Sequence, residues 1–201
     1  MDISIVLAVY NNFDYTRRFY EHIRTIYPNV PLIITDGGSN DETKEWGRNI
    51  NDPYTLFFGV EKKLNFSNNY NLAINLVKTK KLVLVHNDMI IGNNFLENLD
   101  KHVDEHTILS YTTIEPPIFS SDSRPGKIIK DFGSSFEDFD YDNFNLYVNK
   151  KNDDIIYDGA SFFMSAYKKT FLDVGGFDGI SFFPYFCEDD DFLIRAKLKV
   201  Y

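Results

Sequence analysis

Apolar and amphipathic segments alternate along the first half of the chain. Runs that are almost continuously apolar predict buried strands at residues 3–10, 32–35, 54–58 and 81–85. Apolar residues at helical spacing predict helices at residues 14–26, 42–46, 67–77 and 95–102. We expect Asp14 to cap the first helix, and Ser39 or Asp41 to cap the second. Strands that alternate with helices in this way predict a mostly parallel α/β sheet flanked by helices.

The second half of the chain is less regular. Residues 112–154 are rich in Pro, Ser, Asp and aromatic side chains, and we expect a surface excursion rather than a separate domain. Further strands are predicted at 127–129 and 160–164, and a helix at 168–174 that ends at Gly175-Gly176. The total length of 201 residues predicts one domain.

Composition narrows the class of partner. Hydrophobic residues make up 43% and charged residues 25%, which is ordinary for a globular protein. The net charge of −9 argues against nucleic acid or an anionic membrane as the main partner. An anionic ligand would then need a local cation, most simply a divalent metal.

Cysteine count and hydropathy suggest a location. The single cysteine, Cys187, rules out an internal disulfide framework and a cysteine-based zinc site. We find no signal peptide, and no apolar run approaches the ~20 residues of a transmembrane helix. The sequence therefore predicts a soluble, cytoplasmic protein.

Four consecutive acids, Glu188-Asp189-Asp190-Asp191, follow the aromatic segment 182–186. Because like charges repel and burial disfavours ionisation, we expect at least one of these carboxyls to have a raised pKa. Such clusters often bind a cation or transfer a proton, whereas a solvated acidic loop is the simpler alternative. The same negative neighbours should raise the pKa of the Cys187 thiol, which makes it a poor nucleophile.

Three polar clusters follow predicted strands: Tyr10-Asn11-Asn12, Asp36-Gly37-Gly38-Ser39 and His86-Asn87-Asp88. The carboxyl ends of parallel strands are where ligands bind in open α/β sheets. In the second cluster, the Asp36 carboxylate can accept hydrogen bonds from a base or ribose. An ordinary tight turn explains the residues of this cluster equally well. In the third, the final aspartate can bind Mg²⁺ or Mn²⁺, while a structural role is favoured for the histidine.

Asn65, Asn68, Asn69 and Asn71 gather at the start of a predicted helix. Amides at that position can bind a polar ligand or cap the helix. There is no Walker-type phosphate loop, no G-x-G-x-x-G after the first strand and no G-x-S-x-G nucleophile elbow.

In this order, these clusters resemble the motifs of the GT-A fold family 2 glycosyltransferases. Segment 3–12 resembles the family's first strand and V-Y-N turn, and segment 35–41 resembles its D-[DG]-x-S-x-D motif. Segment 65–73 stands at the N-x-G-x-x-x-A-x-N motif without its central Gly and Arg, and segment 86–88 keeps only the last Asp of D-x-D. The most specific likeness is the series G-x-x-x-x-x-[RK], V-G-G-F-D and E-D-x-D-[LF]-x-x-R over residues 159–195.

The resemblance implies a GT-A domain with a nucleotide-sugar half, 1–111, and an acceptor half, 112–201. It implies inverting transfer from a UDP-linked sugar to a glycan or other hydroxyl, with Asp189 as general base, Glu188 beside it, and Asp88 as ligand of Mn²⁺ or Mg²⁺. Asp191 is expected to hold the helix and Arg195, and Asp190 to face water. The implied donor contacts are Val9, Tyr10, Asn11, Asp36, Gly37, Ser39, Asn65, Asn69 and Asn87.

Two other functions remain open. A catalytically silent nucleotide-binding fragment is favoured by the incomplete motifs and by the short segment after the acids, where family members continue. A sugar nucleotidyltransferase has a related sheet, but it normally carries a basic, Gly-rich signature early in the chain, which the Asn11-Asn12 turn does not supply.

Overall fold

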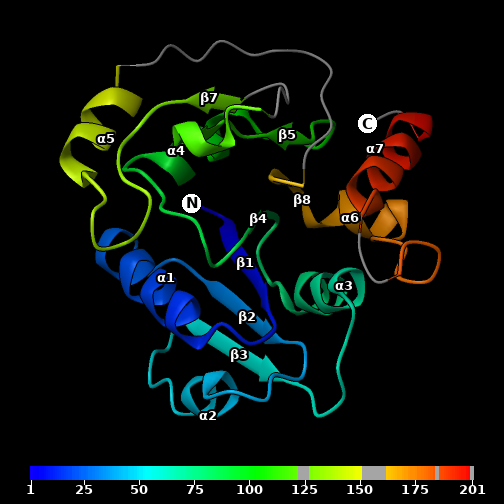
Figure 1. Ribbon diagram of the computed structural model, residues 1–201. Helices are drawn as coiled ribbons and strands as arrows, with labels where there is room; N and C mark the ends of the chain where they lie inside the picture. Colours follow the sequence, from blue (N-terminus) through cyan, green and yellow to red (C-terminus); the bar gives the residue numbers. More distant parts are fainter. Residues whose placement is uncertain (122–126, 151–161, 184–185, 200–201) are drawn as a thin grey trace.

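The computed structural model describes residues 1–121, 127–150, 162–183 and 186–199. Its centre is a six-stranded sheet in the order β3-β2-β1-β4-β8-β5 (Figure 1). The first four of these strands are mutually parallel, and β8 is antiparallel to both β4 and β5. The strands span β1 (Ile3–Val9), β2 (Leu32–Asp36), β3 (Thr55–Gly59), β4 (Lys81–Val85), β5 (Leu109–Ser110) and β8 (Met164–Tyr167). The mostly parallel α/β sheet predicted from the sequence is confirmed.

Helices cover both faces of the sheet. They are α1 (Phe13–Ile26), α2 (Thr43–Arg48), α3 (Phe66–Leu76), α4 (Phe95–His102), α5 (Tyr141–Val148), α6 (Lys168–Val174) and α7 (Glu188–Leu198). Alternate residues of β1 enter different cores: Ile5 and Leu7 pack with Phe19 and Ile23 of α1, whereas Val6 belongs to the core that includes residues of α3, α6 and α7. Because both faces are covered, the strand reads as a continuous apolar run. None of the described helices has the length and apolar composition needed to cross a bilayer.

Within the region 112–154, the described residues 112–121 and 127–150 contain more regular structure than the sequence suggested. It contains the parallel pair β6 (Thr113–Glu115) and β7 (Lys127–Ile129), the 3₁₀-helix η1 (Pro117–Phe119) and α5. Phe132, Phe139 and Phe144 pack together, with ring centroids 5.2 to 6.4 Å apart. Aromatic side chains therefore supply a small core that the irregular composition concealed.

Three predicted boundaries are wrong. Asp14 lies inside the first turn of α1, whose N-cap is Asn12 in the left-handed region. Asp41 instead accepts hydrogen bonds from Phe13 N (3.0 Å) and Thr43 N (3.1 Å), so one carboxylate serves the first turns of both α1 and α2. The N-cap of α2 itself is Glu42, and not Ser39 or Asp41 as expected. The strand predicted at 160–164 begins only at Met164, and its residues 160 and 161 lie outside the described residues.

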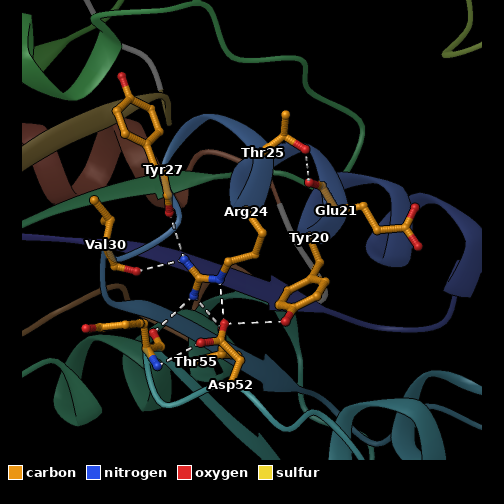
Figure 2. Close-up of polar contacts among 9 residues, drawn as sticks. Tyr20, Glu21, Arg24, Thr25, Tyr27, Val30, Asp52 and Thr55 are labelled. Carbon is orange, nitrogen blue, oxygen red and sulfur yellow. Dashed lines mark hydrogen bonds and ion pairs between the residues drawn. The ribbon is translucent and has the colours of Figure 1, made fainter.

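Arg24 ties the end of α1 to the start of β3 (Figure 2). Its Nε lies 2.5 Å from Asp52 Oδ2, its Nη2 donates to Thr55 Oγ1 at 2.5 Å, and its Nη1 donates to the carbonyls of Tyr27 and Val30. The side chains of Arg24 and Asp52 are each 13% exposed. The pair is mostly buried. It lies near the amino end of β3, away from the carboxyl ends of the parallel strands.

We expect Asp52→Ala to lower the free energy of unfolding by about 3 kcal/mol, because it leaves a mostly buried guanidinium without its partner. Burial raises the pKa of Asp52, but hydrogen bonds from Thr55 and Tyr54 and the charge of Arg24 outweigh it and hold the pKa below its usual value. The difference between wild type and variant should therefore shrink in acid, as the pH falls through this lowered pKa.

Urea unfolding at a series of pH values measures this effect. Glu21→Ala is the matched control, since Glu21 forms an exposed ion pair with Arg17 at 2.8 Å. Its removal should cost about 0.5 kcal/mol or less. Equal losses from the two variants would contradict a stabilising role for the Arg24 network.

Candidate functional site

The three polar clusters meet at one edge of the sheet. Strands β1, β2 and β4 are parallel neighbours, with Val9 opposite Asp36 and Leu7 opposite Val85. Their carboxyl ends therefore bring the Tyr10, Asp36 and His86 clusters together. The convergence predicted from the sequence is confirmed.

The turn after β2 is built around Asp36, which is completely buried. Its Oδ1 accepts hydrogen bonds from Ser39 N, at 2.9 Å, and from Ser39 Oγ. Ser39 Oγ in turn accepts a hydrogen bond from Asn11 N at 2.6 Å, and Gly37 N donates to Val9 O at 2.8 Å. These bonds fix the turns after β1 and β2 against each other.

Two buried oxygen atoms beside this turn have no hydrogen-bond donor, namely Asp36 Oδ2 and Asn69 Oδ1. The amide nitrogen of Asn69 donates to Val9 O at 3.0 Å, and a Cβ on Gly37 would lie 2.7 Å from that nitrogen. A buried acceptor without a donor costs roughly 1–3 kcal/mol. Glycine lets the amide approach, and the free acceptors suit a ligand that donates N–H or O–H groups.

A positive charge lies beside the same turn. Lys63 Nζ stands 4.1 Å from the ring centroid of Tyr10, which is 37% exposed. The backbone of residues 62 and 63 packs closely on Gly38, and Leu64 N donates to Gly37 O at 2.9 Å. An acidic chain thus places a cation next to its candidate ligand turn, where it can attract an anionic ligand.

Asp88 is exposed and lines two cavities. The smaller, of about 170 Å³, is also lined by Ala8, Phe66, His86 and Asn87. The larger, of about 1650 Å³, extends past α4 and β5 to α5, and Leu193 and Lys197 of α7 line it as well. Asn87 donates its amide N–H to Thr16 Oγ1 at 3.0 Å and so is held against α1.

His86 is enclosed by aromatic rings. It stacks on Phe162 at 4.8 Å and meets Phe66 and Phe163 edge-on at 5.8 and 5.3 Å. Burial lowers its pKa, against the charge of Asp88, and its Nε2 is buried without a hydrogen-bond partner. The ring therefore forms an aromatic wall of the small cavity that Asp88 also lines.

The donor atoms present suit a metal that shares its coordination with a ligand. Within the described ranges, no three His, Cys, Asp or Glu side chains come together as a metal-binding group. Mg²⁺ typically takes one or two protein carboxylates and completes its shell with phosphate and water. Asp88 fits such a site, since it supplies one exposed carboxylate beside a small cavity.

The four acids form the first turn of α7. Glu188 is 7% exposed and its Oε2 has no partner; burial and then the charges of Asp189 and Asp190 raise its pKa. Asp191 Oδ2 accepts from Arg195 Nε and Nη2 at 2.9 and 2.6 Å, and Asp190 is exposed. The expected pKa rise and the expected places of Asp190 and Asp191 are confirmed. Asp189 is half-buried and is not among the described residues that line either cavity.

Glu188→Gln is expected to stabilise the protein at neutral pH. A carboxyl whose folded-state pKa is raised binds more protons in the folded state, so its ionisation removes stability as the pH rises above the ordinary glutamate pKa of 4.5. Urea unfolding should show a higher free energy of unfolding for Glu188→Gln than for wild type at about pH 8, and no difference between them at about pH 4. Glu45→Gln, at an exposed glutamate in the first turn of α2, is the control and should show no such difference.

Some residues that shape the site were missed. Tyr70 Oη and Tyr111 Oη donate to the carbonyls of Val85 and Leu84, at 2.7 and 2.6 Å, and so support the end of β4 just before the Asp88 cluster. Burial raises the pKa of both phenols, so they remain hydrogen-bond donors. Isolated tyrosines carry no motif, and nothing in the sequence marks them.

The asparagine cluster mostly contacts the protein itself. Asn65 caps α3 by accepting from Asn68 N at 2.8 Å, and it donates to Gly179 O at 2.6 Å. Asn71 makes two further bonds to the same distant loop. The capping alternative from the sequence thus applies to Asn65, while Asn69 keeps a free acceptor next to Gly37.

Comparison with known proteins gives a family. The model of glycosyl transferase family 2 matches residues 4–172. No curated protein sequence matches this chain. Residues 159–161, which open the motif series found at 159–195, lie outside the described residues.

Several solved structures share the fold. S. aureus TarS (residues 1–349) has a TM-score of 0.68 at 14% identity, over 98% of this chain and 56% of TarS. The same protein in complex with UDP gives 0.65 at 16% identity, over 98% and 55%. The mannosyltransferase PcManGT from Pyrobaculum calidifontis, in complex with GDP-Man and Mn²⁺, gives 0.63 at 14% identity, over 100% and 53%.

The chain spans slightly more than half the length of these structures. At such identities the likeness concerns the fold, a single GT-A domain with a central, mostly parallel sheet. The family match covers most of the sequence. The chain therefore belongs to glycosyl transferase family 2, as its motifs predicted.

Proposed function

We propose that this chain transfers a sugar from a nucleotide-diphosphate donor, UDP-linked, to an acceptor hydroxyl with inversion at the anomeric carbon. The observation that carries the proposal is the meeting of the Tyr10, Asp36 and Asp88 clusters at one sheet edge in a family 2 chain. Structures with the same fold were solved with UDP, UDP-GlcNAc and GDP-Man. We assign residues 1–111 to donor binding and residues 112–201 to the acceptor.

The nucleotide would lie on the turns after β1 and β2. Asp36 Oδ2 and Asn69 Oδ1 would accept hydrogen bonds from the base or ribose, which satisfies two buried acceptors. The Tyr10 side chain, 37% exposed and with Lys63 Nζ over its ring, would lie beside the base. Val9, Asn11, Gly37 and Ser39 shape these turns through contacts within the protein. We also keep Asn65 and Asn87 as proposed donor-site residues; their amides donate to Gly179 O and Thr16 Oγ1.

Asp88 would hold Mn²⁺ or Mg²⁺ together with the donor diphosphate. When bound, the metal supplies positive charge that stabilises the departing diphosphate. The enclosed His86 ring would border this site on its apolar side. In this role Asp88 binds and orients, and its exposed position leaves the carboxylate accessible to the ion.

Asp189 would act on the acceptor. Its carboxylate takes the proton from the acceptor hydroxyl as the oxygen bonds to the anomeric carbon. The bond between that carbon and the diphosphate oxygen breaks on the opposite face, which inverts the configuration. The buried Glu188 lies beside it, and the charge of Asp189 is one of the causes, after burial, that raise the pKa of Glu188.

Incubation with a panel of nucleotide sugars, with Mn²⁺ present, tests the reaction. We expect release of the nucleoside diphosphate from UDP-linked donors, and β-linked product from an α-linked donor. Nucleotide binding without release from any donor would favour a catalytically silent nucleotide-binding protein, the alternative that the incomplete N-x-G and D-x-D motifs favour. The cytoplasmic location expected from the sequence remains a prediction, and cell fractionation tests it.

A further inference from the structure

We propose that Asn71 is a positioning residue: its carboxamide clamps the loop segment 175–179, which follows α6, and thereby fixes the acids at the start of α7. The inference rests on the proposed function, because it gives that site a support between its donor half and its catalytic acids. In Figure 1 this loop lies next to α3.

The clamp is a two-point contact between one side chain and one backbone unit. Asn71 Nδ2 donates to Phe177 O at 2.8 Å, and Phe177 N donates to Asn71 Oδ1 at 2.9 Å. Six positions earlier, at the N-cap of α3, Asn65 Nδ2 donates to Gly179 O at 2.6 Å. Residues spaced by three positions share a helix face, so α3 presents a row of amides along the loop.

The loop is shaped to receive these amides. A Cβ on Gly176 would lie 2.5 Å from Asn71 Oδ1, and a Cβ on Gly179 would lie 2.5 Å from Asn68 Oδ1. Gly176 also has a φ of +71°, which side chains rarely adopt. Glycine at these positions is therefore a condition for the contact, and the V-G-G-F-D segment gains a physical role.

The opposite side of the loop is held by α7. Arg195 Nη1 donates to Val174 O at 2.7 Å, and Nη2 donates to Gly176 O at 2.8 Å, while Asp191 fixes the guanidinium. Between the two anchors, Phe177 is 2% exposed and its ring centroid lies 5.2 Å from that of Phe192. The loop thus links α3, which carries the donor-site residue Asn69, to the helix that begins at Glu188.

Loss of the clamp should act through α7. Both polar atoms of the Asn71 carboxamide are bonded to the backbone of Phe177, so the side chain is assigned a positioning role. If the loop loosens, α7 loses its fixed position and water reaches the Glu188 carboxyl. The pKa of Glu188 should then fall towards its ordinary value, because burial is the main cause of its rise.

Asn71→Ala tests the clamp, with Asn75→Ala as the matched control. Asn75 lies one turn further along α3, and its side chain donates only to Asn71 O within the helix. Carboxyl ¹³C NMR titration measures the pKa of Glu188 directly, calorimetry the affinity for UDP, and steady-state kinetics the turnover. For Asn71→Ala we expect a lowered Glu188 pKa, a kcat reduced about tenfold or more, and UDP affinity within about twofold of wild type.

A Glu188 pKa and a kcat that both keep their wild-type values in Asn71→Ala would overturn the inference, and so would equal effects from Asn75→Ala. Failure of the wild-type protein to bind any nucleotide would overturn the proposed function instead, while the NMR titration still decides whether Asn71 controls Glu188. If Asn71→Ala does not fold, Asn71→Asp keeps the acceptor for Phe177 N and removes the donor to Phe177 O. The same changes are expected for it, and their absence rejects the clamp.

Discussion

Replacement of Asp189 with asparagine is expected to lower the rate of sugar transfer by about 10³-fold and to leave UDP affinity nearly unchanged. Asparagine has the shape of aspartate but cannot take up the proton of the acceptor hydroxyl. The side chain lies half-buried in the first turn of α7, next to the buried Glu188. Single-turnover kinetics with donor and acceptor, alongside calorimetry with UDP, measures both quantities.

Asp190→Asn is the matched control for that variant. Asp190 belongs to the same helical turn but is exposed, so its loss should change the transfer rate by less than about threefold. A large loss in both variants would point to the charge of the whole turn, and an unchanged rate in Asp189→Asn would remove Asp189 as the base.

Asp88→Asn should have the second largest effect. It removes the carboxylate assigned to the metal and leaves the neighbouring small cavity otherwise intact. We expect UDP affinity to lose its dependence on Mn²⁺, and transfer to fall by about 10²-fold or more, as when one preorganised electrostatic group is removed. Titrations of UDP at several Mn²⁺ concentrations measure the first effect, and initial rates measure the second.

Asp14→Asn provides the comparison for Asp88. Asp14 also contributes an exposed carboxylate to the large cavity, but it does not line the small one. The Mn²⁺ dependence of UDP binding should survive in this variant. If the Mn²⁺ dependence of UDP binding is lost in both Asp14→Asn and Asp88→Asn, the ion acts through the general negative charge of the surface and not through a site at Asp88.

The sheet was predictable because its physical cause is local. Residues 3–9 are buried on both faces, so almost every position of β1 is apolar and the strand is visible in the sequence. The start of α1 was not, since the carboxylate that serves it belongs to Asp41, 28 positions beyond Phe13. Asp14, the nearest acid in the sequence, was predicted to be the cap, but the tertiary structure brings the carboxylate of Asp41 to the start of the helix.

The candidate site was predictable in its position but not in its division of roles. The acidic run indicated that one carboxyl would have a raised pKa, but the packing of α7 determines that Glu188 is the buried member. The amides on α3 had two explanations at the sequence level. The hydrogen-bond partners of these amides in the structure distinguish the two explanations. The partner of Asn65, Gly179, lies 114 positions away in the sequence.

Calorimetric titration of the wild-type chain with UDP, with and without Mn²⁺, tests the central claim most directly. The claim is that the turns after β1, β2 and β4 form a nucleotide-diphosphate site that a divalent metal completes. For the wild-type chain we predict saturable UDP binding whose affinity is higher in the presence of Mn²⁺. For Asp88→Asn we predict a UDP affinity that no longer depends on Mn²⁺. Absence of nucleotide binding in the presence of Mn²⁺, or binding that is the same with and without the metal, would contradict it.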